Sequence, residues 1–406
     1  MASRELGPGV YSVGVAAPTL RDFHGFVTNH GVTYNSYLVV DEKIALIDTV
    51  RHTLAEELLQ NVAGIIEPSK IDYVVSNHAE PDHSSGLTQV MGTVSNATVV
   101  CTPKCQSAFE GYFDGTWPYK TVKTGDTLSL GKQNLQFLAT PMVHWPDSMM
   151  TYLPSEKILF SMDAFGQHIS NSHCYDDELP LDLIMDEARR YYANIITPLG
   201  SLVLKTLAVA QGVDIKIIAP SHGVIWRSHI PVIAEAYKKW ASLESDAKVT
   251  VVFDSMWGST EQMARAVLDG AVRSGADGQL VHLRRNGLTE AAAEILEAAA
   301  VAVGSPTLHN RPMPEVAAFL SYVKGLCPVA PGKNDPRGKG RVGLAFGSHG
   351  WSGGGAKMAG QALAEVGYQM LEPVICCVHR ADQGTLEKCR QAGAELAKKA
   401  RELAGN

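Results

Sequence analysis

Two histidines and two carboxylates fall within six residues of the stretch SNHAEPDH, which spans residues 76–83. His78, Glu80, Asp82 and His83 follow an apolar run that predicts a buried strand, so we expect them on the loop at its end. Imidazole and carboxylate groups are common ligands of first-row transition metals. We therefore interpret this stretch as the main ligand loop of a site for two metal ions.

Three later predicted strands each lead to another possible ligand. These strands span 135–140, 158–162 and 215–219, and they lead to His144, Asp163 and His222. Strands that feed one core deliver the residues at their ends to one edge of a sheet, so four separated segments can converge on a single pocket. Any one of these histidines could be an ordinary surface residue, but that interpretation does not suit the whole set.

The seven candidate ligands divide into two sets and a bridge. We assign one metal to His78, Glu80 and His144, and the other to Asp82, His83 and His222. Asp163 is the expected bridge, because a carboxylate has two oxygens and can bind both ions. His83 is an open assignment, because a bridging water could serve the second metal and leave that position partly vacant.

The spacing H-x-E-x-D-H of this loop resembles the H-x-H-x-D-H signature of the metallo-β-lactamase superfamily, with Glu80 in place of the second histidine. In zinc hydrolases, the neutral nitrogen ligand at that place suits zinc. A carboxylate there, together with Asp82 and Asp163, makes a harder and more anionic site. We therefore predict a pair of iron ions that cycle between the ferrous and ferric states.

A second candidate site follows the apolar strand predicted at 249–253. The next residues are DSMWGST (254–260), and a helical pattern starts at once. Hydroxyl and backbone N–H groups at a helix N-terminus can bind a phosphate without a lysine. The chain has neither the G-x-x-x-x-G-K-[ST] loop of triphosphate sites nor a strand-linked G-x-G-x-x-G with a following acid. A flavin that carries a phosphate, FMN, therefore fits this loop best.

Two Gly-rich loops follow later strands of the same region. They span residues 304–310 and 347–354, and Trp351 in the second could stack on a planar ring. Each loop alone could be a plain turn, but three in succession at the carboxyl ends of parallel strands indicate one binding crevice. The predicted flavin-binding residues are Ser255, Met256, Trp257, Gly258, Ser259, Thr260, Pro306, Thr307, Leu308, His309, Asn310, Ser348, His349, Gly350, Trp351, Ser352 and Gly353.

The elements that would position these sites belong to two kinds of domain. Residues 8–50 alternate short β-branched and aromatic runs with turn residues, which indicates an antiparallel meander. The polar, charged stretch 232–248 suggests a boundary, so we predict domains at 1–248 and 249–406. In the second, five apolar strands alternate with helical patterns, which predicts a doubly wound α/β fold with five parallel strands. The Pro/Gly-rich insert at 327–340 is interpreted as a mobile loop.

Composition excludes several classes of partner. The 406 residues carry a formal net charge of -7, so nucleic acid is not an expected partner. No long uncharged apolar stretch and no signal-peptide pattern occur, and the expected location is the cytoplasm, with no membrane contact. Seven scattered cysteines without a C-x-x-C pair fit reduced thiols better than disulfides.

From about residue 5 to the end, the chain resembles the flavodiiron proteins, also called A-type flavoproteins or the rubredoxin:oxygen oxidoreductase family. The motifs that carry the resemblance are NHAEPDH, VHWPDSM, SMDAFG, PSHGVIWR, DSMWGSTEQMA, VGSPT and FGSHGWSGG. It implies a diiron site on a metallo-β-lactamase-like αββα sandwich and FMN on a flavodoxin-like domain. The implied reaction is reduction of dioxygen to water or of nitric oxide to nitrous oxide.

The resemblance also implies partners and two further site residues. A head-to-tail homodimer, or a dimer of such dimers, would place each flavin against the diiron site of the other chain. No C-x-x-C pair is present to hold a rubredoxin iron, so we expect a separate donor such as rubredoxin. His24 and Tyr192 are possible groups beside the metals, and both could equally be buried core residues.

Two other classes of protein stay open. One is a zinc hydrolase fused to a flavodoxin, which metal analysis would distinguish and which Glu80 disfavours. The other is an electron carrier with an inert first domain, in which alanine at His78 would leave the function intact.

Overall fold

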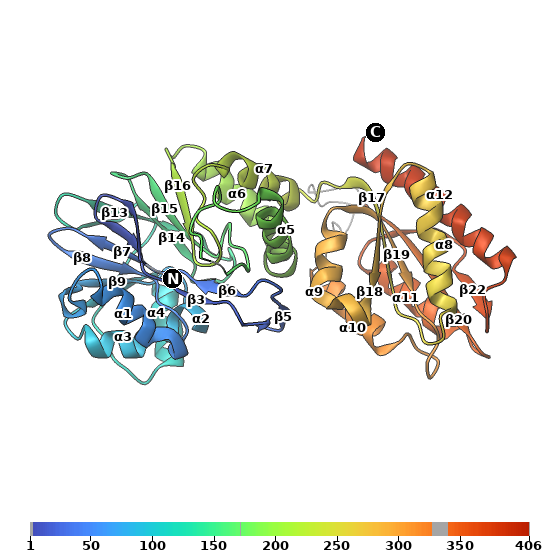
Figure 1. Cartoon of the computed structure of the whole chain (residues 1–406), viewed down its shortest axis with the longest axis horizontal. Helices are drawn as coiled ribbons and strands as arrows, with labels where there is room; N and C mark the ends of the chain where they lie inside the picture. Colours follow the sequence, from blue (N-terminus) through green and yellow to red (C-terminus); the bar gives the residue numbers. More distant parts are fainter. Residues whose placement is uncertain (1–2, 171, 327–339, 406) are drawn as a thin grey trace. The chain divides into compact units, whose positions relative to one another are not determined.

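The computed structural model describes residues 3–170, 172–326 and 340–405, and the chain forms two compact units (Figure 1). The first comprises Met1–Tyr191 and Leu202–Tyr237, and the second comprises Tyr192–Ser201 and Lys238–Asn406. The predicted division into 1–248 and 249–406 stays a prediction. The predicted insert at 327–340 lies outside the described residues, except for Gly340.

The first unit contains a mixed seven-stranded sheet in the order β1-β2-β7-β8-β9-β10-β11. Neighbours from β1 to β8 are antiparallel, and those from β8 to β11 are parallel. The strands are β1 Arg4–Gly7, β2 Val10–Ser12, β7 Tyr37–Val40, β8 Ile44–Ile47, β9 Tyr73–Val75, β10 Thr98–Cys101 and β11 Tyr119–Thr121. The antiparallel start matches the predicted meander.

Part of that predicted meander forms two small hairpin sheets instead. Strand β3 (Val15–Ala17) pairs with β6 (Val32–Tyr34), and β4 (Asp22–Phe23) pairs with β5 (Phe26–Val27). The loop of the second hairpin holds His24 and Gly25, both at positive φ.

A second sheet of five strands has the order β12-β13-β14-β15-β16. The first four strands are antiparallel, and β16 joins β15 in parallel. The strands are β12 Thr127–Ser129, β13 Asn134–Ala139, β14 Met149–Leu153, β15 Ile158–Met162 and β16 Ile217–Pro220.

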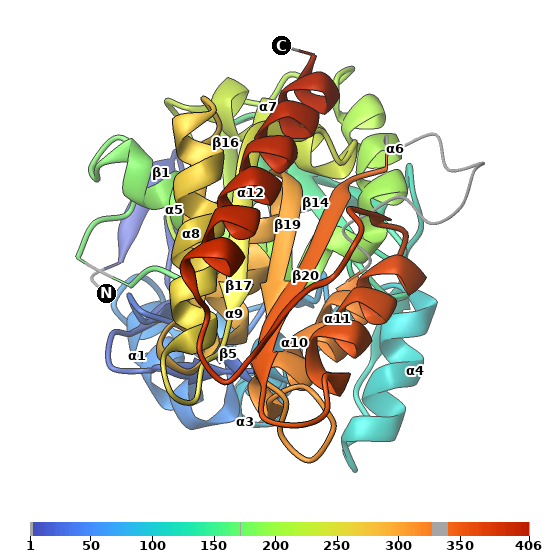
Figure 2. The ribbon, with the colours of Figure 1, turned by 90° about the vertical axis from the view of Figure 1, so that its right-hand side faces the viewer.

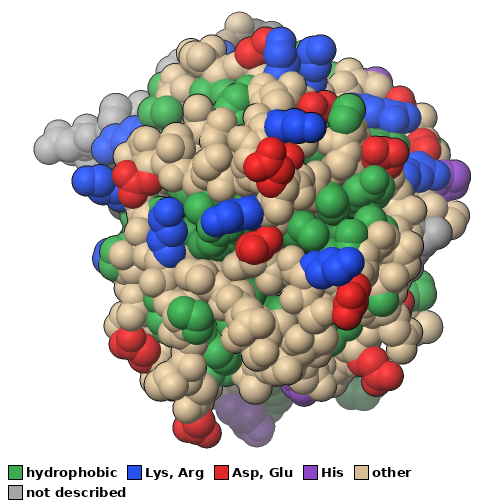
Figure 3. All heavy atoms as spheres, turned by 90° about the vertical axis from the view of Figure 1, so that its left-hand side faces the viewer, with side chains coloured by type: hydrophobic (Ala, Val, Ile, Leu, Met, Phe, Trp, Pro, Cys, Tyr) green, Lys and Arg blue, Asp and Glu red, His purple; other side chains and the backbone are tan. Residues whose placement is uncertain are grey.

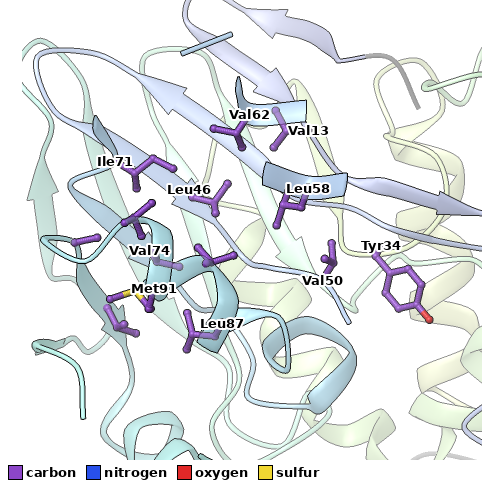
Figure 4. Packing of buried hydrophobic residues seen from close by; sticks show 14 of the residues in the cluster. Val13, Tyr34, Leu46, Val50, Leu58, Val62, Ile71, Val74, Leu87 and Met91 are labelled. Carbon is purple, nitrogen blue, oxygen red and sulfur yellow. The ribbon is translucent and has the colours of Figure 1, made fainter. Parts of the chain in front are cut away.

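Side chains from the two sheets share one buried core. Strand residues alternate between faces, so Val39 and Ile47 enter the core between the sheets, and their neighbours Leu38 and Leu46 enter a second core under helices. Figure 4 shows part of that second core, where Leu58 and other helix side chains face the strands. This is the predicted αββα arrangement.

The helices of the first unit cover the outer faces of the sheets. In α1, Ala55, Leu58 and Val62 recur at helical spacing and are buried, so one stripe faces the core. The helices are η1 His52–Leu54, α1 Ala55–Ala63, η2 Pro68–Lys70, α2 Pro81–Ser84, α3 Leu87–Thr93, α4 Pro103–Tyr112, α5 Leu181–Tyr191, α6 Gly200–Ala210 and α7 Ile230–Ala241. Between α5 and α6 lie the π-helix Tyr192–Ile196 and the 3-10 helix Thr197–Leu199.

Residues 181–210 form the one helical run, within the described ranges, that is long and apolar enough to cross a membrane. About a third of its most apolar window is buried. Tyr191, within this run, hydrogen-bonds a buried carboxylate of the first unit. The run is therefore tied to the domain fold by a polar contact.

The second unit has an all-parallel sheet with the order β18-β17-β19-β20-β22, and the short β21 also pairs with β20. The strands are β17 Asp246–Phe253, β18 Asp277–His282, β19 Ala298–Gly304, β20 Val342–His349, β21 Gln369–Met370 and β22 Ile375–Val378. The five predicted parallel strands are confirmed, with two-residue β21 as an addition.

Helices cover both faces of this sheet, as expected for a doubly wound fold. Val251 and Phe253 pack with residues of α8 and α12, whereas Val252 packs with residues of α9, α10 and α11. Figure 2 shows α8 and α12 in front of β17 and β19. The helices are α8 Ser259–Arg273, α9 Leu283–Leu296, α10 Pro314–Leu326, α11 Gly354–Glu365 and α12 Gln383–Ala404.

Candidate functional site

The predicted ligand loop connects β9 to the one-turn helix α2. Pro81 occupies the first helical position, where its missing N–H is not needed, so Asp82 and His83 fall within that single turn. Asn77 anchors the loop, because its backbone N–H and side-chain amide donate to the two oxygens of Asp48 at 2.7 and 2.9 Å. These two hydrogen bonds to Asp48 hold the loop in place.

The structure brings all seven predicted ligand side chains together. Their donor atoms form two groups, each with all of its atoms within 4.8 Å of one another. The groups are His78, Glu80, His144 and Asp163, and Asp82, His83 and His222. The second group equals the second predicted set, and the first group is the first predicted set together with Asp163; the role of these residues as ligands stays a prediction.

Asp163 stands between the two groups. Its Oδ2 lies 3.2 Å from His144 Nε2 and 3.5 Å from His78 Nε2. Its Oδ1 lies 3.1 Å from His83 Nε2 and 3.5 Å from His222 Nε2. Each oxygen therefore faces a different group, which is the geometry that a bridging carboxylate needs.

The backbone around Asp163 and His222 explains how they reach the cluster. Met162, the last residue of β15, has a positive φ of 57°, which turns the chain sharply before Asp163. His222 follows β16, and the parallel pairing of β15 with β16 brings the ends of these two strands to the same edge. The carboxyl ends of neighbouring parallel strands thus deliver both side chains.

The cluster is electrostatically arranged for a cation. Burial by itself would raise the pKa of Asp163, but the imidazoles of His83 and His144 outweigh it and hold that pKa well below its usual value. Burial would lower the pKa of His83, but Asp82 and Asp163 raise it to about 9. The pKa of Glu80 is also lowered, because hydrogen bonds to His144 and His78 outweigh its burial. Such a cluster stabilises positive charge at its centre, which suits metal ions.

Two histidines are fixed in the form that binds a metal through Nε2. His222 Nδ1 lies 2.6 Å from the carbonyl oxygen of Thr33, which only accepts, so Nδ1 carries the proton. His78 Nδ1 lies 3.0 Å from Asp147 Oδ2, and Ala79 N donates to the same oxygen at 2.6 Å. Both Nε2 atoms therefore face the cluster, 3.2 Å from Glu80 Oε2 for His78 and 3.1 Å from Asp82 Oδ2 for His222, where a bound metal ion would take the place of a proton. Asp147 was not predicted, although it lies in the motif that holds His144.

The two additional predicted residues have different environments. His24 Nδ1 lies 3.4 Å from Glu80 Oε1, so His24 lies at the edge of the cluster. Tyr192 is buried and packs its ring against Trp240, with centroids 5.2 Å apart. The tyrosine that reaches the cluster is Tyr191, whose hydroxyl donates to Asp163 Oδ1 at 2.9 Å. The resemblance implied Tyr192, and the structure places its neighbour Tyr191, in the same helical run, against the cluster.

His168 is a further neighbour that the sequence did not indicate. It is 4% exposed, and its ring lies 4.8 Å from that of Tyr191. Burial, then the nearby His222, hold its pKa well below the usual value, so His168 is neutral. His168 therefore places an uncharged imidazole beside the cluster.

In the second unit, the strand ends form a cavity of about 640 Å³. Three predicted loops line it, together with His379, which follows β22 and was not predicted. The lining residues are Met256, Trp257, Ser259, Pro306, Thr307, Leu308, His309, Asn310, Ser348, His349, Gly350, Trp351, Ser352 and His379. This position, at the carboxyl ends of parallel strands, is where doubly wound folds bind ligands.

The other predicted residues surround this cavity. Ser255 Oγ accepts from Gly258 N at 3.1 Å, and Thr260 Oγ1 lies 3.0 Å from Ser348 Oγ. Gly258 precedes α8 with a positive φ of 84°, a conformation that suits glycine. Gly353 lies against the ring of His349.

The residues present suit a flavin that bears one phosphate. Hydroxyls of Ser255, Ser259 and Thr260 gather at the N-terminus of the 15-residue helix α8, where the helix dipole favours an anion. The rim holds two large aromatic side chains, Trp257 and Trp351, which are 91% and 94% exposed. The rim therefore offers apolar surface on which a planar ring could pack.

Comparison with known proteins covers both units. The family model described as ODP family beta lactamase matches residues 32–223, and the flavodoxin model matches residues 251–393. The chain is 42% identical to a nitric oxide reductase of Moorella thermoacetica, over 96% of each chain.

Two solved structures match almost the whole chain. The flavodiiron protein of Giardia intestinalis is 38% identical with a TM-score of 0.95, covering 100% of this chain and 98% of that one. Rubredoxin oxygen:oxidoreductase of Desulfovibrio gigas is 35% identical with a TM-score of 0.93, covering 100% of both chains.

Proposed function

Because this chain belongs to the flavodiiron protein family, we propose that it is an oxidoreductase that reduces dioxygen or nitric oxide at a non-haem diiron centre. The seven clustered ligand side chains hold the two irons, and the cavity of the second unit holds FMN. Electrons pass from an external donor to FMN and then to the irons.

The placement of Asp163 supports this function most directly. One carboxylate presents an oxygen to each of two ligand sets, so the cluster suits a pair of metal ions rather than one. Glu80 adds an anionic ligand where zinc hydrolases of this fold have a neutral imidazole, and such a site suits iron. The metal pair, when bound, supplies one-electron steps and charge stabilisation for a small gas molecule.

The number of electrons explains why two cofactors share one chain. Reduction of dioxygen to two waters takes four electrons, and coupling of two nitric oxide molecules to nitrous oxide takes two. Two ferrous ions and one two-electron flavin together hold four. The side chains at the cluster would hold the irons, and the contacts at Nδ1 of His78 and His222 aim the Nε2 atoms toward them.

We propose a rubredoxin-type protein as the electron donor and a head-to-tail homodimer as the working unit. The exposed indoles of Trp257 and Trp351 support the dimer, because large apolar groups at the rim of a cofactor cavity suit a surface that another chain covers. A closed two-fold arrangement would use that surface twice.

A mixed dimer tests this arrangement. One chain carries His78→Ala with His144→Ala, and the other carries changes at Ser255, Ser259 and Thr260. Each is expected to be inactive alone, and refolding the two together should restore up to about half of the sites. If mixed dimers form and no activity returns, the head-to-tail arrangement is wrong.

We also propose a cytoplasmic location. The six described cysteines are all free thiols, and five of them are buried, which suits a reducing compartment. On the face of the first unit drawn in Figure 3, Lys and Arg side chains alternate with Asp and Glu, and no basic patch is visible there.

Metal analysis followed by gas kinetics tests the function. Anaerobically prepared protein should hold about two irons and one FMN per chain, and stopped-flow mixing with each gas should show reoxidation of the flavin. About two zinc ions with hydrolase turnover and no gas reduction would overturn the proposal. His78→Ala should abolish gas reduction while FMN stays bound, and retained function would favour an electron carrier.

A further inference from the structure

Arg284 of α9 reaches across to the loop that follows β17. Strands β17 and β18 run in parallel, and Phe253 at the end of one pairs with His282 at the end of the other. Asp254 and Arg284 come just after these two residues, so their side chains meet although 30 positions separate them in the sequence. The loop that starts at Asp254 leads into α8, where the hydroxyls that suit a phosphate gather.

Asp254 is a buried carboxylate whose charge Arg284 compensates. Asp254 is 0% exposed, and its Oδ1 accepts from Arg284 Nε at 2.8 Å and from the backbone N–H of Ser255 at 2.7 Å. Among the described residues, Arg284 is the one arginine or lysine within ion-pair distance of this carboxylate. Removal of one partner from a buried ion pair leaves an uncompensated charge, which is strongly unfavourable. The start of the loop therefore depends on Arg284.

The same guanidinium fixes a peptide group of the loop. Arg284 Nη2 also donates to the backbone carbonyl oxygen of Ser255. The C=O and N–H of a trans peptide group point to opposite sides, so the N–H of Met256 points away from Arg284. Met256 lines the flavin cavity, and no described residue accepts a hydrogen bond from its N–H. The contact therefore keeps the carbonyl oxygen occupied and leaves the N–H available to a bound anion.

Ser255 is thus held at each of its polar atoms. Its N–H donates to Asp254 and its carbonyl oxygen accepts from Arg284. Its Oγ accepts from the N–H of Gly258 at 3.1 Å and from that of Glu261 at 3.4 Å. Because Oγ accepts two hydrogen bonds, the proton of this hydroxyl is left to donate to another group. A phosphate at the start of α8 would accept it.

We propose that Arg284, paired with Asp254, is a positioning residue for the phosphate of the flavin. This inference rests on the proposed function, because it requires FMN in this cavity. Arg284 sets the direction of the peptide group between Ser255 and Met256, and it balances the charge of Asp254. A phosphate then meets N–H and O–H donors, and it meets neither a free carbonyl oxygen nor an uncompensated carboxylate.

The physical reason is that an anion is bound by donors that already point at it. Without Arg284, the peptide group after Ser255 can rotate, and the carboxylate of Asp254 keeps its negative charge beside the loop. Both changes act against a phosphate, since an oxygen dipole and a like charge repel it. Neither change acts on the uncharged part of the flavin. The effect of Arg284 should therefore be specific to flavins that carry the phosphate.

Binding of FMN and of riboflavin, which lacks the phosphate, tests this proposal. Each flavin is titrated into the full-length, iron-loaded protein after removal of its own flavin. In Arg284→Gln, FMN affinity should fall at least about tenfold, because contacts between charged groups are lost, while riboflavin affinity stays unchanged. Arg273→Gln is the matched control, because it removes an arginine that pairs with Asp269 at 2.7 Å at the other end of α8, and it should bind both flavins as the wild type does.

The same titrations in concentrated salt separate positioning from simple attraction between charges. At about 1 M salt the Debye length is about 3 Å, so a charge that acts from a distance is screened. The direction of a peptide group does not depend on salt. The loss of FMN affinity in Arg284→Gln should therefore persist in concentrated salt, and its disappearance there would overturn the inference.

The ratio of the two affinities separates this inference from the proposed function. Equal losses for both flavins, as a merely structural role predicts, or an unchanged FMN affinity would overturn the inference and leave the function intact. A wild type that binds no FMN would overturn both. If Arg284→Gln does not fold, Asp254→Asn is compared with the double variant Asp254→Asn and Arg284→Gln, in which no buried charge is left unpaired. Equal ratios in those two proteins would overturn the inference.

Discussion

The metal cluster and the flavin cavity achieve specificity in opposite ways. At the cluster, seven candidate ligand side chains bring their donor atoms together, and most of them are buried, with orienting partners such as Asp147 behind them. At the cavity, loops at strand ends supply the walls, and two indoles at the rim are more than 90% exposed. Metal binding at the cluster therefore depends on the types of its side chains. Flavin binding at the cavity depends chiefly on how closely the backbone segments of its walls approach one another. Substitutions should separate these two kinds of dependence.

The largest effect is expected from Asp163→Ala. Loss of the shared carboxylate removes an oxygen from both ligand sets, so iron content and gas reduction should fall more than about a hundredfold, beyond what loss of an outer partner costs. FMN should stay at one per chain, which plasma mass spectrometry of iron and flavin absorbance would show. Glu57→Ala, an exposed carboxylate in the same unit, is the control. Retention of both irons would show that Asp163 is no bridge.

The corresponding change at the cavity is Gly347→Ala. Gly347 lies near the end of β20, and a Cβ there would lie 1.9 Å from the carbonyl oxygen of Ser305, so β20 must move away from the segment that follows β19. FMN affinity should fall more than about tenfold, since strained packing of this kind costs about 1–3 kcal/mol, and iron content should stay unchanged. Fluorescence titration of the apoprotein with FMN measures the loss. Gly325→Ala, where no atom lies within 4 Å of the added carbon, should bind FMN normally.

A smaller effect is expected from Asp147→Asn, which keeps the shape of the side chain and removes its charge. Orienting partners of this kind typically contribute ten- to hundredfold to metal affinity, and we expect the low end, about tenfold. Competition with a chelator measures the affinity. Mössbauer spectra should show one altered iron, because Asp147 contacts His78 of the first ligand set. Two equally altered irons would contradict this asymmetry.

The smallest effect is expected from Thr260→Val at the start of α8. The change removes a hydroxyl that lies 3.0 Å from Ser348 Oγ, and a hydrogen bond to a charged phosphate contributes about 1.5–3 kcal/mol. FMN affinity should fall about tenfold, the low end of that range, because Ser255 and Ser259 remain, and equilibrium dialysis would detect the shift. A complete loss of FMN would mean that one side chain dominates the cavity, against the comparison drawn above.

Residues at strand ends were predictable, because a strand pattern followed by a polar residue already implies an edge of a sheet. His144, Asp163 and His222 belong to that class. Asp147, Tyr191 and His379 do not. Asp147 lies on a loop that folds back onto His78, and these two residues are 69 positions apart in the sequence. Tyr191 and Tyr192 differ by one step of about 100° around a helix, and sequence does not set that rotation. His379 follows a strand without any glycine-rich signature.

The two exposed indoles give this chain a built-in optical reporter. Of its six tryptophans, Trp257 and Trp351 flank the cavity and face solvent, whereas Trp226 and Trp240 are 0% and 3% exposed. Emission from Trp257 and Trp351 will be red-shifted while the cavity is empty. It will be quenched by energy transfer when an isoalloxazine ring lies beside these two indoles. Intrinsic fluorescence therefore reports cofactor occupancy, and a second change in the same signal reports burial of the rim by another chain.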